Sequence, residues 1–269
     1  MLTFSVLSIL PSAAFAQGDL LITPRRVVFE GSKQSQELTL ANTGRDTARY
    51  NVSFVQYRMN ENGSFEQIEE PDSGQYFADK YLRFFPRSVT LAPGESQVVR
   101  MQFRRMPDMK PVEYRSHVYF RAVPKETALG DDLQQDSTSI GIRLIPIFGI
   151  TIPVIIRPAE LSVTTELRDI VLDTKSDTIP YLSVTFDRSG DKSVYGDIIV
   201  SWIPDKGPAV EVGVVRGIAV YTPNKVRRFR MQLLKKEGID YAKGKLQVRY
   251  QSPGDLKPEV YATREISLQ

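Results

Sequence analysis

Apolar and polar residues alternate with a period of two along most of the chain. The runs at 99–103, 182–186 and 246–250 show this alternation clearly. Successive side chains of a β-strand point to opposite faces, so each run predicts a strand with one buried and one solvated face. No segment keeps apolar residues at helical spacing through about three turns. The sequence therefore predicts an all-β fold.

Turn-forming residues divide these runs into short strands, for example at Asn62-Gly63, Pro93-Gly94 and Pro253-Gly254. About seven strand candidates precede residue 158, and roughly six or seven follow it. The first group lies near 20–29, 35–42, 49–58, 87–91, 97–105, 113–123 and 142–157. Seven short antiparallel strands build an immunoglobulin-like sandwich, so we expect two such domains, 17–157 and 158–269.

Two polar stretches of the first domain lack the strand pattern. Residues 60–80 and 125–140 are rich in Asp, Gln, Ser and Gly. Such composition is typical of surface connections, so we predict two long mobile loops.

The first residues have the pattern of an export signal. A short apolar stretch is followed by Pro11 and by Ala14-Phe15-Ala16, the small-x-small pattern that signal peptidase accepts. This predicts a signal peptide over 1–16 and a mature chain that begins near Gln17; an apolar N-terminal strand is the alternative. The chain has no Cys, so it has no disulfide framework and no thiolate metal site.

The composition argues against an enzyme. His117 is the only histidine, which excludes a His cluster, an HExxH motif and a His-based triad pair. Asp131-Asp132 lacks the further oxygen ligands that a calcium site needs, and no glycine-rich phosphate loop occurs. The net charge of +3 is small and the basic residues are scattered among acids. We therefore expect no catalytic site, metal or cofactor, and no nucleic-acid or membrane-surface partner.

One segment does not fit an ordinary sandwich strand. Residues 144–156 read LIPIFGITIPVII and carry no charge. A membrane helix needs about 20 residues and two prolines would interrupt it, so the segment favours a strand. Because Pro146 and Pro153 have no N–H, that strand belongs at a sheet edge or carries a bulge, and we predict the bulge near Gly149. A core strand of the first domain is the alternative; pairing with another chain is the sharper hypothesis.

The order of several motifs resembles one family, the periplasmic pilus chaperones of the chaperone/usher pathway, in a divergent branch. The resemblance rests on Glu113 and on the segments 21–31, 85–87, 91–100, 119–124 and 142–158, the last ending in Arg157-Pro158. It implies two immunoglobulin-like domains in an L-shaped arrangement with a cleft between them. It also implies a periplasmic location, pilus or surface-fibre subunits and an outer-membrane usher as partners, and no ATP.

The resemblance further implies that the seventh strand completes the fold of a subunit that lacks its own last strand. The expected donating residues are Leu144, Pro146 and Phe148, flanked by Ile142 and Ile150, whereas Ile145 and Ile147 would face the protein's own core. Such a donated strand supplies main-chain hydrogen bonds and buried side chains together.

The family anchors the subunit's terminal carboxylate with an Arg on the first strand and a Lys on the seventh. Arg26 stands at the Arg position, but Pro153 stands at the Lys position. Arg25, Arg143 and Arg157 are possible substitutes, and the sequence does not choose among them. An exported two-domain adhesin or fibre component is the alternative function, disfavoured because the apolar strand lies in mid-chain.

Overall fold

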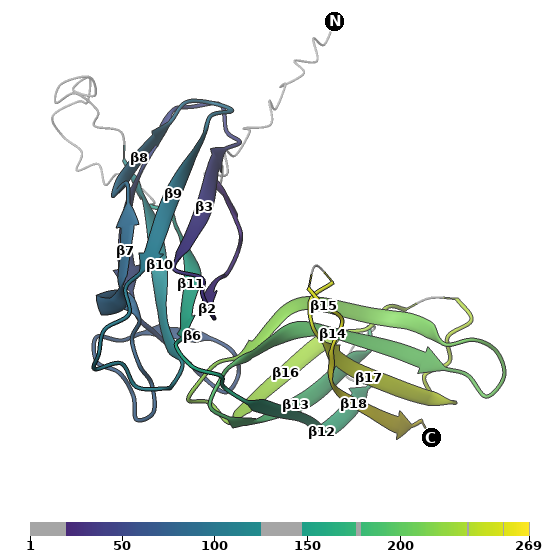
Figure 1. Cartoon of the computed structure of the whole chain (residues 1–269). Coiled ribbons are helices and arrows are strands. Elements are labelled where there is room, and N and C mark those ends of the chain that lie inside the picture. The colour runs from purple at the N-terminus through teal and green to yellow at the C-terminus, as the bar shows by residue number, and fades with distance from the viewer. Residues whose placement is uncertain (1–19, 125–146, 176–178, 236, 255, 269) are drawn as a thin grey trace, which may run out of the picture.

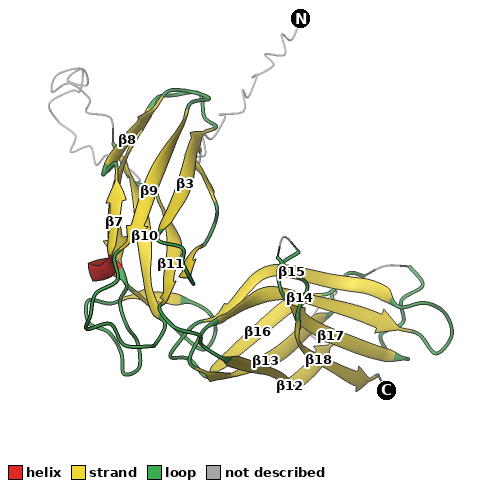
Figure 2. Ribbon diagram, in the orientation of Figure 1, coloured by secondary structure: helices red, strands yellow, loops and turns green. Residues whose placement is uncertain are grey.

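The computed structural model describes residues 20–124, 147–175, 179–235, 237–254 and 256–268, which form two β-sandwiches set at an angle to each other like the arms of an L (Figure 1). Almost all regular structure is strand (Figure 2). The predicted fold class is confirmed. The predicted signal peptide at 1–16 and the loop at 125–140 lie outside the described residues.

The first sandwich packs a four-stranded sheet, in the order β1-β3-β9-β7, on a five-stranded sheet, in the order β2-β11-β10-β4-β8. The strands are β1 (Leu20–Thr23), β2 (Val27–Glu30), β3 (Ser35–Asn42), β4 (Ala48–Val55), β7 (Leu82–Phe85), β8 (Ser88–Leu91), β9 (Ser96–Phe103), β10 (Tyr114–Val123) and β11 (Gly149–Arg157). Inward residues of both sheets, such as Leu38, Met101 and Phe120, form one buried core.

The second sandwich packs a sheet of order β12-β13-β16 on a sheet of order β15-β14-β17-β18. Its strands are β12 (Val163–Asp173), β13 (Tyr181–Gly190), β14 (Val194–Ile203), β15 (Val210–Val220), β16 (Val226–Gln232), β17 (Lys245–Gln251) and β18 (Val260–Ser267). Its core contains Phe186, Tyr250 and Trp202, the only tryptophan of the chain. A third, smaller apolar cluster joins the sandwiches and includes Met59, Ile155, Ala219 and Tyr221.

The strand expected at 20–29 is two strands in two different sheets. β1 pairs antiparallel with β3, whereas β2 pairs parallel with β11. Residues 24–26 carry the chain from one sheet to the other. The run of apolar residues across Pro24 gave no sign of this switch, because both halves face the same core.

Most of 60–80 lies outside helices and strands, as predicted, but two short elements within or beside it were not predicted. Strands β5 (Tyr57–Met59) and β6 (Phe65–Gln67) form a separate antiparallel hairpin, and η1 (Asp79–Tyr81) is a short 3₁₀-helix. Arg58 donates two hydrogen bonds to Asp72, at 2.7 and 2.5 Å, and Tyr81 is almost completely buried. Polar residues of this stretch, such as Asp72, form internal hydrogen bonds that hold its conformation. Strand β7 was also missed.

The described part of β11 has no bulge, so the prediction of a bulge near Gly149 is wrong there. Its register against β10 is unbroken from Arg121↔Gly149 to Tyr114↔Ile156. The Ala122 N–H donates to the Phe148 carbonyl at 2.9 Å, which extends the regular pattern by one residue. Glycine at 149 leaves room for the Tyr119 ring: a Cβ there would lie 2.1 Å from Cε2 of Tyr119, and the ring would have to move.

Candidate functional site

Strand β11 pairs with β10 on one side along nearly its whole length, but on its other side it is paired along only part of its length. β2 pairs with it only from Val154 to Arg157. Among the described strands, none pairs with Gly149–Pro153 on that edge. A strand edge of this kind presents unpaired main-chain groups to any further strand.

The main-chain groups on this edge follow from the β10 register. The hydrogen bond at Phe148 makes the even-numbered residues of β11 the ones that bond β10. The N–H and C=O groups of Gly149 and Thr151 therefore point to the open edge. Pro153 is also odd-numbered, so its missing donor faces away from β10, as expected for a proline at an edge. Pro146 lies outside the described residues.

The same register decides which side chains share a face. Ile150 and Ile152 contact the first core, so the even-numbered face is the core face. Ile147 lies on the opposite face and is 43% exposed. The expectation that Ile147 packs on the protein's own core is therefore wrong, because the alternation runs without a break from Phe148 onward. Ile145 lies outside the described residues.

Of the five predicted donating residues, Phe148 and Ile150 are described, whereas Ile142, Leu144 and Pro146 are not. Ile150 packs partly on the first core, so it is only in part available to a partner. Phe148 is 48% exposed and lies on the same strand face, beyond the end of the core. A partner that covers Phe148 would thus extend the core of this sandwich.

Arg26 lies where the open edge ends. It directly precedes Val27, which pairs with Val154. Its guanidinium carbon stacks 4.6 Å from the ring centre of Tyr195, and its Nη2 donates weakly to Ser193 Oγ at 3.5 Å. Both contacts are with the second sandwich, so Arg26 lies between the domains, as the resemblance implied.

Sequence reasoning missed a second arginine at this place. Arg115 of β10 is opposite Ile155, on the face that looks toward the second sandwich. Its guanidinium carbon lies 4.5 Å from the ring centre of Tyr221, and that of Arg26 lies 5.9 Å from the same ring. Burial lowers the pKa of Arg115, and Arg26 acts in the same direction. An anion placed beside Arg115 would favour its charged form.

The other arginines considered as substitutes are differently placed. Arg157 donates from Nε to Glu113 at 2.9 Å and from Nη2 to the Ser193 carbonyl at 3.1 Å. Arg25 is exposed, and Arg143 lies outside the described residues. Because Arg157 is already paired with a buried carboxylate, it is not free to replace the family's lysine.

Glu113 connects the two sandwiches. Its side chain is fully buried; it accepts from the Ser193 N–H with both oxygens at 3.1 Å and from Thr222 Oγ1 at 3.2 Å. Together with Arg157 it forms a buried ion pair whose other partners all belong to the second sandwich, except Glu30. The angle between the domains is thereby fixed by charged groups.

His117 has the structural role expected for a strand side chain. It is 4% exposed and packs edge-on against Tyr57 and Phe65. Burial, helped by Arg115, lowers its pKa to about 3. No three His, Cys, Asp or Glu side chains of the described residues gather into a possible metal site.

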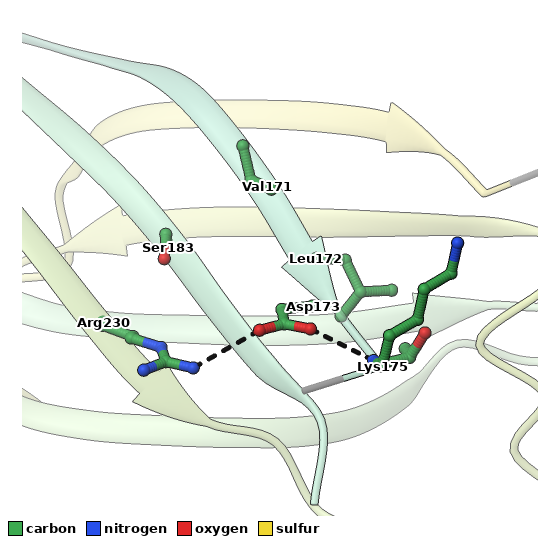
Figure 3. Close-up of a pocket in the computed structure, with 7 residues that line it drawn as sticks. Val171, Leu172, Asp173, Lys175, Ser183 and Arg230 are labelled. Carbon is green, nitrogen blue, oxygen red and sulfur yellow. Dashed lines mark hydrogen bonds and ion pairs between the residues drawn. The ribbon is translucent and has the colours of Figure 1, made fainter. Parts of the chain in front are cut away.

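Two surface depressions lie away from the cleft. One, of about 720 Å³, lies beside the end of β12, where Asp173 links Arg230 to the Lys175 N–H (Figure 3). The other, of about 470 Å³, lies on β7 and β9 beside Phe85 and Val98. A lining arginine of each forms a local ion pair, Arg230 with Asp173 in the first and Arg100 with Glu37 in the second. The residues that line these two depressions do not form a recognisable catalytic or metal-binding arrangement.

Residues 19–162 match the family model described as "Pili and flagellar-assembly chaperone, PapD N-terminal domain". The match covers more than half of the 269 residues. The chain belongs to this chaperone family. Family and fold therefore confirm the prediction of a pilus assembly chaperone and not an enzyme.

Solved structures similar to this chaperone include other pilus chaperones. The CupB2 chaperone of Pseudomonas aeruginosa is 15% identical, with a TM-score of 0.44, over 93% of this chain and 100% of that one. The YadV chaperone is 12% identical, with a TM-score of 0.45, over 93% and 100%. The CsuC–CsuE chaperone–tip adhesion subunit complex of Acinetobacter baumannii is 13% identical, with a TM-score of 0.44, over 93% and 99%. A comparison with curated proteins gives no match. No helix in the described part of the chain has the length and apolar character to span a bilayer.

Proposed function

We propose that this chaperone holds a pilus subunit in the periplasm by adding its β11 to the subunit's incomplete sheet. The observation that carries the proposal is the open edge of β11 at Gly149–Pro153, with exposed Phe148 at one end and Arg26 at the other. A subunit that lacks a strand exposes both an apolar groove and unpaired main-chain groups. A long edge strand with apolar side chains satisfies both needs.

The direction of the subunit strand follows from charge. β2 pairs parallel with β11 directly beyond the open edge, and Arg26 stands at the start of β2. A subunit strand that is also parallel to β11 ends with its carboxyl terminus at Arg26. An antiparallel strand would bring its amino terminus there, next to a cation. A terminal carboxylate and a guanidinium form a charge-assisted pair, so the parallel direction is favoured.

Arg115 takes the place of the family's lysine, whose position Pro153 occupies in this chain. Its Nε and Nη1 have no hydrogen-bond partner among the described residues, and neither has Nε of Arg26. Both guanidinium groups lie against the ring of Tyr221. Two guanidinium groups that lie near one ring, on or next to the two strands that flank β11, suit a single carboxylate between them.

The apolar part of the interaction is assigned to Phe148, together with Leu144, Pro146 and Ile142 on the residues before it. Burial of one such side chain is worth about 1.5–3 kcal/mol, less the cost of association. The same proposal includes export through the predicted signal peptide at 1–16 and delivery of the subunit to an outer-membrane usher. It also includes the domain limits 17–157 and 158–269.

Substitution of Phe148 by glutamate tests the proposal. The variant Phe148→Glu places a charge where the subunit groove should be apolar, which costs more than the lost burial. The protein is purified from the periplasm of cells that make its pilus, and the co-purifying subunits are identified by mass spectrometry. Phe85→Glu is the matched control, because Phe85 is 78% exposed on β7 of the other sheet.

We expect subunits with the wild type and with Phe85→Glu, and none with Phe148→Glu. Leu144→Glu should behave like Phe148→Glu. Unchanged subunit capture by both Phe148→Glu and Leu144→Glu would show that β11 does not enter the subunit.

A further inference from the structure

Of the two cations in the cleft, Arg115 is closed off from solvent and Arg26 is partly exposed. Arg115 is 3% exposed, although two of its nitrogens lack a hydrogen-bond partner among the described residues. Its third nitrogen, Nη2, donates to the Tyr57 carbonyl at 3.2 Å. A buried donor without a partner costs about 1–3 kcal/mol. The closed arrangement is therefore less favourable for Arg115 than one in which an anion reaches it.

The β5–β6 hairpin makes the cover. Tyr57 of β5 supplies the carbonyl above Arg115, and Met59 packs with Tyr221 in the cluster that joins the domains. Phe65 of β6 lies 6.2 Å from the ring of Tyr221 and 5.7 Å from that of His117. Yet Phe65 is 47% exposed, so it lies on the cleft without being enclosed by it.

The hairpin is attached differently at its two ends. At its base, the Tyr57 carbonyl also accepts from Gln75 Nε2 at 3.0 Å, and the Tyr57 ring packs edge-on against His117 of β10. β5 and β6 pair only with each other and belong to neither sandwich sheet. The base is thus anchored to the first domain, whereas the two strands are free of the sheets.

The tip is held only by the second domain. The Arg228 N–H donates to the Glu61 carbonyl at 2.6 Å, and the Arg228 side chain forms an ion pair with the Glu61 carboxylate. Asn224 Nδ2 donates to the Met59 carbonyl at 2.6 Å. Both side chains of the Arg228–Glu61 pair are more than half exposed, and exposed ion pairs contribute little stability. Release of the tip breaks this ion pair and the two hydrogen bonds, and it also exposes Met59, which is 4% exposed in the closed form.

We propose that the β5–β6 hairpin is a lid over a carboxylate-binding site formed by Arg26 and Arg115. The lid opens by release of Glu61 and Met59 from Arg228 and Asn224, admits the carboxyl terminus of an extended chain, and closes over it. This extends the proposed function, since the ligand is the terminal carboxylate of the strand added to β11.

A reversible crosslink at the tip tests the lid. Glu61 and Arg228 are joined by a main-chain hydrogen bond, so their Cα atoms lie within disulfide reach. The chain has no cysteine of its own. In E61C/R228C the disulfide locks the hairpin when oxidised and releases it when reduced. The single variants E61C and R228C, treated in the same way, are the controls.

Two measurements are made on each form. The first is the rate at which phenylglyoxal, an arginine reagent, modifies Arg115, followed by peptide mass mapping. The second is the affinity for a ten-residue peptide of alternating Val and Thr with a free carboxyl terminus, relative to the same peptide with a terminal amide. A charge-assisted hydrogen bond is worth about 1.5–3 kcal/mol, so the free acid should bind the reduced form at least about tenfold more tightly.

Oxidation should slow the modification of Arg115 at least about tenfold and remove the preference for the free acid, and reduction should restore both. Equal modification rates in the oxidised and reduced forms would overturn the lid. Peptide binding without any preference for the free acid, in the wild type and the reduced form alike, would instead overturn the carboxylate site, whatever the modification rates.

Discussion

The buried ion pair between Glu113 and Arg157 should make the two domains unfold together. We consider the substitution Glu113→Ala. It removes the acceptor for the Ser193 N–H, for Thr222 Oγ1 and for Arg157 Nε, all of which bind the fully buried carboxylate. The Arg157 side chain, only 11% exposed, then keeps the more distant Glu30 at 3.4 Å and the Ser193 carbonyl.

The magnitude follows from what is left behind. Removal of one partner of a buried ion pair costs about 3–5 kcal/mol, mostly because the other charge stays buried without compensation. Since Arg157 retains Glu30 and a carbonyl, we expect a loss of about 3 kcal/mol in the free energy of unfolding. The double variant E113A/R157M should recover more than half of this loss, because it removes the uncompensated charge.

Guanidinium chloride unfolding measures both the size and the location of the effect. Trp202 is the only tryptophan and lies in the second core, so its fluorescence reports the second domain, whereas far-ultraviolet circular dichroism reports both. The two signals should coincide in the wild type and separate in Glu113→Ala. A loss below about 1 kcal/mol with coincident transitions would refute the reasoning, and so would a double variant whose loss is the sum of the two single losses.

Two further predictions concern the outward face of β10. His117 has an ordinary pKa of 6.5 when unfolded and about 3 when folded, so the unfolded state binds more protons between these values and stability falls as the pH drops through that range. From pH 6.5 to pH 5 the wild type should lose about 1.6 kcal/mol more than His117→Phe in denaturant titrations, and equal losses would contradict this. Gly149→Ala should cost about 1–3 kcal/mol because its Cβ meets the Tyr119 ring; the midpoint of chemical unfolding measures it, and an equal cost in a Tyr119→Ala background would show that the ring is not the cause.

The sequence predicted best those features that a single physical rule determines, such as the strands and the position of a proline within a sheet. Alternation with a period of two predicted the strands and both sandwiches, because a side chain at every second position must face the core. Pro153 predicted an edge, since a residue without an N–H cannot occupy the bonded side of a ladder. Arg26 was placed between the domains by the resemblance, and the structure puts it next to Tyr195 and Ser193 of the second domain.

The sequence was least informative where two distant segments meet. Arg115 stands in an alternating strand and looks like an ordinary solvated arginine; only Tyr57 and Tyr221, far away in the chain, bury it. The β5–β6 hairpin had a readable signal in Tyr57, Met59 and Phe65 around Asn62-Gly63, which is a common hairpin turn. Its strands are only three residues long, however, and the polar composition of 60–80 outweighed that signal.

Pro153 also limits how a further strand can be placed on β11. The open edge offers both groups of Gly149 and Thr151, but at Pro153 it offers only a carbonyl, and one residue later β2 already occupies the edge. A strand that slides toward Arg26 therefore loses a hydrogen bond at one position and meets a steric stop at the next. In the proposed complex, Pro153 and the start of β2 would therefore set the position at which an added strand has to end.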